Sequence, residues 1–322
     1  MRLRASIAAV AFGATTLFTG CFTGIESTPK IGADDVRRNN AAAPSPEKLF
    51  LDVVEAEAPR LWRPGVTHFR VDSAAHLSRI FTPASAPSDA MQGRTLTFAG
   101  FERGTSLTGD TLAEVRLTDA AGNTYFYRSN VGVSSLDTLR RLDIPFMVNV
   151  GEVAAVDSML RGRHLFVRTS LWYDGQGSAV AGLRHVEVCV DSVGVGYSAY
   201  PAAVYFTVAD STLAREAGIA AGDRRMLLMT VGTSTAASRN FDKLFTFENP
   251  RRRYPDIAAR TWELIVRGRV ADGMTRDECR LALGAPDELL RVPTRGGMRE
   301  TWTYAHGVYL VFDDGYLSHF SQ

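Results

Sequence analysis

The chain has three cysteines and six histidines, the residue types that most often act as nucleophiles, metal ligands or modification sites, and one cysteine stands in a distinctive context. Cys21 follows a basic start, with Arg2 and Arg4, and an apolar run from Ile7 to Phe18. A run of about a dozen residues is too short to cross roughly 30 Å of hydrocarbon as a helix, but it suits the apolar segment of an export signal. We therefore expect an export leader that ends beside Cys21.

The end of this run, Leu17-Phe18-Thr19-Gly20-Cys21, resembles the lipobox of bacterial lipoproteins, with Phe18 where that family usually has leucine. The resemblance implies that residues 1–20 are a signal peptide. It also implies that the Cys21 thiol receives a diacylglycerol thioether and becomes the acylated first residue after cleavage, an anchor of several chains. Phe22 replaces the aspartate that often signals inner-membrane retention, which favours the outer membrane. The alternatives are an ordinary secretory peptide cut near Gly20 and an uncleaved anchor.

The remaining candidates for chemistry form no recognisable site. Cys189 lies in an alternating apolar run and Cys279 on the apolar face of a predicted helix, so both are expected to be free. No nucleophile elbow, phosphate-binding loop or dinucleotide fingerprint occurs. We predict no cofactor, no metal and no enzymatic activity, with a hydrolase that has a carboxylate site between domains as an alternative. The histidines show no metal-ligand spacing; they are His68, His76, His164, His185, His306 and His319.

Composition describes an ordinary folded body. The chain has 322 residues, of which 45% are hydrophobic and 22% charged, and this length allows two or three domains after a leader. A net charge of +1 gives no reason to expect a nucleic-acid partner. The basic segment Arg251, Arg252 and Arg253 is predicted either to contact lipid head groups or a partner, or to be a solvated loop.

Residues 21–46 are short of large apolar side chains and are predicted to be a flexible tether with a reach of roughly 25–30 Å. Ser45, Pro46 and Glu47 are predicted to be the N-cap, the first position and the acidic first turn of a helix. We expect a first β-rich domain over 47–135 and a second over 136–250. Both open alike, at Gly93-Arg94 and Gly162-Arg163, which suggests a duplicated module. Their alternating runs predict strands at 68–71, 94–98, 113–118, 124–127, 164–169, 184–190 and 203–207. The third and fourth of these are predicted to form a hairpin across the turn Asp119-Ala120-Ala121-Gly122-Asn123.

Residues 251–322 are predicted to form a C-terminal module. A helix is expected from Pro255 to near Gly268, and a second helix begins with the capping box of Thr275 and Glu278. Gly284, in the left-handed position, and Pro286 should end this helix. Four strands, at 289–292, 301–304, 308–312 and 317–320, are predicted to follow as an antiparallel meander. The fold class is therefore multidomain α+β: two small antiparallel barrel-like or sandwich-like regions, then a helix–helix–antiparallel sheet module.

The stretch from 257 to 318 resembles the BamE/SmpA-OmlA family, small lipoproteins of the outer-membrane β-barrel assembly machine. The resemblance implies two helices packed on a three-stranded sheet and an envelope-protein partner, the assembly machine among them. Three features depart from the family: Cys279 replaces its usual valine, two β-rich regions precede the module, and the family's loop residues that contact lipid or partner subunits have no match here. The residues that carry the resemblance are those of caps, turns and core: Gly273, Met274, Thr275, Glu278, Gly284 and Pro286, followed by Trp302, Tyr304 and the run from Leu310 to Leu317.

An anchor and a binding module without a catalytic signature predict a non-catalytic outer-membrane lipoprotein. It would face the periplasm as a protein-binding scaffold or assembly accessory, with surface exposure as the alternative topology. Exposed sheet edges favour strand addition by a partner. A second hypothesis is a glycan or lipid ligand held in a cleft lined by Trp62, Trp172 and Tyr173, with core packing as the favoured alternative role of these aromatics.

Overall fold

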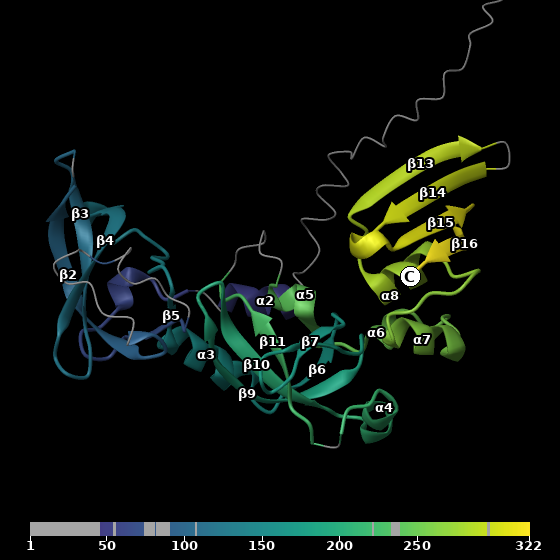
Figure 1. Ribbon diagram of the computed structural model, residues 1–322, viewed down its shortest axis with the longest axis horizontal. Coiled ribbons are helices and arrows are strands. Elements are labelled where there is room, and N and C mark those ends of the chain that lie inside the picture. Colours follow the sequence, from purple (N-terminus) through teal and green to yellow (C-terminus); the bar gives the residue numbers. More distant parts are fainter. Residues whose placement is uncertain are drawn as a thin grey trace, which may run out of the picture. The chain divides into compact units, whose positions relative to one another are not determined.

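The computed structural model describes residues 46–53, 56–73, 81, 91–106, 108–220, 222–232, 239–294 and 297–322. The leader, Cys21 and the predicted tether lie outside these ranges. Residues 45–322 form one compact unit. Its described part is mostly β, with three curled antiparallel sheets and few helices (Figure 1).

The first sheet has the order β4-β3-β2-β1-β5. Strand β3 alternates as the sequence predicts, with the side chains of Ala113, Val115 and Leu117 fully buried. The predicted hairpin turn is confirmed, because the Asp119 carboxylate accepts the backbone N–H groups of Ala121 and Asn123. The strands are β1 (His68–Val71), β2 (Thr95–Thr105), β3 (Thr111–Thr118), β4 (Thr124–Gly132) and β5 (Met147–Asn149).

The second sheet has the order β12-β6-β9-β10-β11-β7-β8, and its core includes the fully buried Trp172 and Phe206. Several short helices accompany it: α2 (Pro46–Val53), where a helix was expected, α3 (Val150–Leu160), α4 (Ser211–Glu216), α5 (Phe241–Leu244) and α6 (Pro250–Arg253). The strands are β6 (His164–Val167), β7 (Leu171–Tyr173), β8 (Ala179–Ala181), β9 (Glu187–Tyr197), β10 (Tyr200–Val208), β11 (Arg225–Met229) and β12 (Phe245–Thr246).

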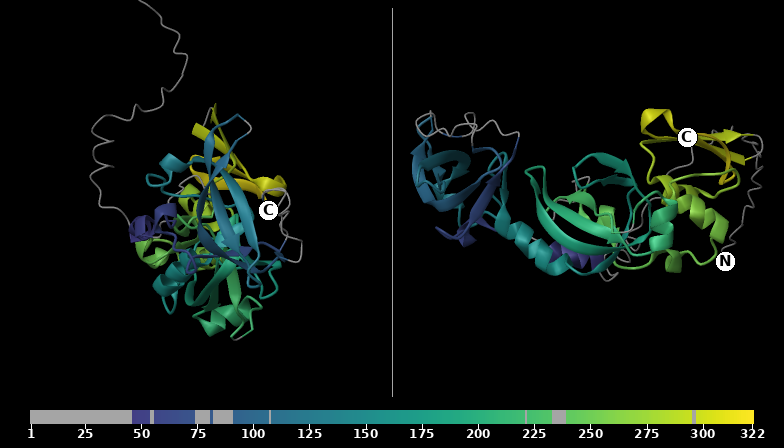
Figure 2. Two further views of the ribbon diagram at one scale, coloured as in Figure 1. Left: turned by 90° about the vertical axis from the view of Figure 1, so that its left-hand side faces the viewer. Right: turned by 60° about the horizontal axis from the view of Figure 1, so that its bottom comes forward.

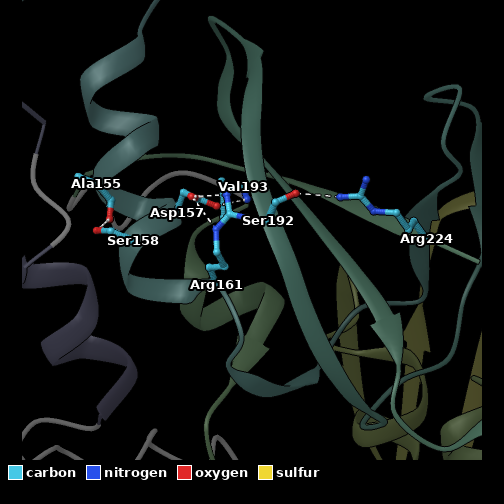
Figure 3. Close-up of polar contacts among 7 residues, drawn as sticks. All are labelled: Ala155, Asp157, Ser158, Arg161, Ser192, Val193 and Arg224. Carbon is cyan, nitrogen blue, oxygen red and sulfur yellow. Dashed lines mark hydrogen bonds and ion pairs between the residues drawn. The ribbon is translucent and has the colours of Figure 1, made fainter. Parts of the chain in front are cut away.

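Helix α3 is fixed to strand β9 by Asp157 (Figure 3). One carboxylate oxygen accepts the Val193 N–H at 2.6 Å, and the other accepts the Arg161 guanidinium at 2.7 Å. Burial raises the pKa of Asp157, but these two donors outweigh it and leave the pKa below its usual value. The Asp157 carboxylate is therefore ionised, and its hydrogen bonds hold helix α3 against strand β9.

The C-terminal elements are α7 (Ala259–Val266), α8 (Arg276–Leu283) and the sheet β13-β14-β15-β16, with strands Glu288–Thr294, Gly297–Thr303, Tyr309–Asp313 and Tyr316–Ser321 (Figure 2). The capping box is present: the Glu278 N–H donates to Thr275 Oγ1 at 3.3 Å, and the Thr275 N–H donates to Glu278 Oε2 at 2.7 Å.

Two predicted helix ends are corrected here. Helix α7 begins at Ala259 rather than at Pro255, because the residues between them form a turn. Gly284 ends α8 with a positive φ of 93°, but its ψ of −168° is extended rather than left-handed helical. Only glycine adopts this backbone conformation readily.

Candidate functional site

Strand β13 differs from every other strand of its sheet because all seven of its residues are exposed. Three of them are large and apolar: Leu289 is 42% exposed, Leu290 61% and Val292 46%. The neighbouring strands instead bury Trp302, Leu310 and Phe312 completely. An exposed aliphatic strand of this kind marks an interaction site or an aggregation hazard.

The register shows where these side chains point. Leu289 is aligned with the buried Trp302, so it lies on the face that packs toward the core. Side chains alternate along a strand, so Leu290 and Val292 lie together on the opposite face. Strand β13 pairs with β14 only, and no other strand in the described ranges lies along its second edge. That edge presents backbone N–H and C=O groups for pairing.

A buried carboxylate holds this edge strand to the rest of the module. Glu300, on β14, is 2% exposed, and its Oε1 atom accepts Arg291 Nε of β13 at 3.1 Å and Arg276 of α8 at 3.0 Å. Its second oxygen accepts the Trp302 indole N–H at 3.2 Å. A buried charge needs such partners to be tolerated. The network therefore joins helix α8, β13 and β14 into one rigid support.

The motif residues of the C-terminal module form backbone hydrogen bonds, a helix cap and core contacts. The Gly273 N–H donates to the Leu317 carbonyl at 2.8 Å, and the Leu317 N–H donates back to Met274 at 2.8 Å. Met274 and Cys279 are buried in the same core. Pro286 follows the Gly284 cap, and the Gly284 carbonyl accepts the Tyr304 hydroxyl at 3.2 Å. These residues position the sheet but do not themselves form the exposed surface.

The aromatic residues proposed to line a cleft do not do so together. Trp62 is 6% exposed in the first core and Trp172 is fully buried in the second. Only Tyr173 is partly accessible, and its hydroxyl accepts Arg239 at 2.9 Å. Cleft lining by the two tryptophans is therefore wrong, and the reason is that both supply core volume.

The histidines that fall in the described ranges also have separate roles. His164 pairs with Glu187 at 2.9 Å, whereas the Nε2 atom of His185 lies 3.0 Å from the Leu281 carbonyl. Burial lowers the pKa of His185 to about 4, so its ring is neutral at pH 7. No group of metal-binding side chains occurs among the residues whose positions are described. Cys189 and Cys279 are free, as their sequence contexts predict.

Two carboxylates that the sequence analysis did not single out, Glu57 and Glu152, line one cavity of about 840 Å³ together with Asp137. Glu152, at the start of α3, accepts the Glu57 backbone N–H at 2.8 Å. The Glu57 carboxylate in turn accepts the Asn149 side-chain amide at 2.9 Å. Burial is the largest of the effects that raise the pKa of Glu152 to about 7, and Asp143 and Glu57 add to it. Sequence patterning gives no signal for this pair, since 95 residues separate its members.

No protein-family model, curated protein or solved structure matches this chain. None of the helices in the described ranges is both long and apolar enough to cross a membrane.

Proposed function

We propose that this chain is a non-catalytic outer-membrane lipoprotein, anchored through Cys21, that binds another envelope protein through strand β13. Two β-rich domains and the C-terminal module would make up its periplasm-facing body. The observation that carries the proposal is the free, aliphatic edge of β13. The residue pattern shared with the BamE/SmpA-OmlA family makes the barrel assembly machine the first partner to test.

Strand addition suits this edge for physical reasons. A partner strand would satisfy the backbone groups along β13, and its side chains would cover Leu290 and Val292 on one face and Leu289 on the other. Burying an aliphatic side chain contributes about 1.5–3 kcal/mol when it is complete, so three partly exposed ones contribute a few kcal/mol. Since the Glu300 network already orders the strand, little ordering entropy opposes binding.

The test is a crosslinked pull-down from native envelopes, with partners identified by mass spectrometry. The double variant L290K/V292K should lose the captured partner, because two charges would have to be buried against it. The matched control is L61K/V66K, which places two charges at residues 50% and 65% exposed outside any strand. Equal capture by both variants would contradict binding at β13.

A second candidate function rests on the Glu57 and Glu152 cavity. A carboxylate with a pKa near 7 beside a second carboxylate is suited to general acid–base hydrolysis. The hydrolysis rate would increase above pH 7 if Glu152 acts as the base and decrease above pH 7 if it acts as the acid. The activity should disappear in E152Q and persist in E216Q, which changes an exposed glutamate. If the purified wild-type protein hydrolyses no glycan or ester in a broad panel, this candidate is excluded.

A further inference from the structure

The first helix of the folded body docks beside the segment that leads into the basic turn α6 (Figure 1). Phe50 of α2 contacts Phe241 and Phe247, with ring centroids 4.2 and 5.8 Å apart. The Glu47 carboxylate accepts the Thr246 hydroxyl at 2.7 Å and the Phe247 N–H at 3.0 Å. The point at which the chain enters the body is therefore fixed to residues 241–247.

Helix α6 follows at once and displays three arginines. Asn249 caps it by accepting the Arg251 N–H at 2.9 Å. Arg251, Arg252 and Arg253 are all exposed, and none of them forms an ion pair with a residue that the structure describes. Arg253 and Pro46 line the same cavity of about 270 Å³. The basic turn thus lies beside Pro46, the residue at which the predicted tether ends and the described part of the folded body begins.

Acidic side chains lie beside this turn, but none of those in the described ranges forms an ion pair with its three arginines. A neighbouring cavity of about 770 Å³ is lined by Arg252 and Arg253 together with Glu187 and Glu248. Glu187 is paired with His164, and Glu47 is occupied by the two donors of the β12 segment. Arg168 adds a further cation at the rim of the Pro46 cavity. Glu248 lines both cavities as well, so the basic character of this surface depends on Arg251, Arg252 and Arg253, which are exposed and form no ion pair with a described residue.

We infer that Arg251, Arg252 and Arg253 bind phosphate groups of the membrane surface that carries the lipid anchor, and that they orient the body on it. The inference deepens the proposed lipoprotein function and rests on its anchor. A basic cluster next to a lipid attachment point supplies a second membrane signal, worth about 1 kcal/mol per arginine near an anionic surface. A flexible tether with a reach of roughly 25–30 Å lets the arginines approach to within a Debye length of the head groups, where the attraction acts.

The test uses the chain from residue 22 onward, which retains the compact unit of residues 45–322 and has no lipid. Its partition onto vesicles of phosphatidylcholine mixed with phosphatidylglycerol is compared with partition onto phosphatidylcholine alone. The variant R251Q/R252Q/R253Q should bind the anionic vesicles on the order of a hundredfold more weakly than the parent chain. The control, R63Q/R94Q/R103Q, removes the same charge from exposed arginines of the first β-rich region and should lose much less.

Three results would overturn the inference: no preference for anionic vesicles, equal losses in the two variants, or full competition by millimolar inorganic phosphate. The last would assign the arginines to a soluble phosphate ligand instead. Circular dichroism verifies that both variants are folded. Because no lipid is attached, failure here does not bear on the Cys21 anchor, which acyl labelling of the full chain tests separately.

Discussion

At the scale of single residues, folding buries Glu152 in part and Glu300 almost entirely, and burial changes the pKa of the first and makes the second depend on its ion-pair partners. The sequence alone predicts neither effect in full. Glu152 lies in an ordinary helical first turn, and its pKa is raised mainly by burial in the folded protein, with smaller contributions from Asp143 and Glu57. Glu300 offers a weak signal, since it shares the inward parity of Trp302 along an alternating strand. A charged residue at such a position predicts a buried ion pair, but not its partners.

Glu152 should make stability fall as pH rises. Its pKa is about 7 in the folded protein against 4.5 ordinarily, so the folded state binds the proton more tightly than the unfolded state. The stabilisation is complete below pH 4.5 and is lost as pH rises through 7. E152Q keeps the acceptor for Glu57 without a charge, so we expect it to be about 1–3 kcal/mol more stable than wild type at pH 8. Urea unfolding at pH 5 and pH 8 measures this, and an equal difference at the two pH values would contradict it.

Removing the Glu300 carboxylate should destabilise the C-terminal elements. E300A leaves Arg276 and Arg291 without their anion and the Trp302 indole without an acceptor, at a cost of about 2–4 kcal/mol after allowance for the partly exposed arginines. Denaturant titration followed by Trp fluorescence measures the change. E288A, on the exposed strand β13, is the control and should change stability by less than about 0.5 kcal/mol.

At the scale of elements, local chemistry was predictable and long-range pairing was not. The capping box and the hairpin turn at Asp119 depend on residues three or four positions apart, and both are present. The placement of β12 beside β6, and of β7 beside β11, joins segments separated by dozens of residues through core packing. The start of α7 shows the limit of local signals, because a proline that suits a first helical turn stands in a β-turn instead.

The cap of α8 provides an element-scale test. T275A removes the oxygen that accepts the Glu278 N–H, and we expect a loss of about 1 kcal/mol, which lowers Tm by about 2–4 °C. T275S retains the acceptor and should melt within about 1 °C of wild type. Equal melting of all three proteins in a thermal scan would show that the sheet, rather than the cap, holds the helix.

At the scale of the whole molecule, the first described residue of the folded body, Pro46, lies beside the arginine-bearing helix α6, and β13 has one edge that no described strand covers. Patterns in the sequence identified the arginines as a candidate contact and predicted a strand at 289–292, but did not mark that strand as a binding edge. Their surroundings depend on the tertiary fold: α2 must dock on residues 241–247, and β13 must extend beyond the core that its neighbours bury. Attachment and binding would thus be separate functions of one body.

Salt should separate the two contributions to membrane attachment. The wild-type chain, with acyl chains at Cys21, should resist extraction from envelopes at roughly 1 M salt, because burial of hydrocarbon is not screened. C21S, exported behind an unrelated cleavable leader, should lose incorporated labelled palmitate and be released by the same wash, because at a Debye length of about 3 Å the arginines no longer attract phosphate. C21S that stays bound at high salt would show that a protein partner holds the chain in place. Wild-type chain released with it would instead mean that Cys21 carries no lipid and that the leader is an ordinary secretory one.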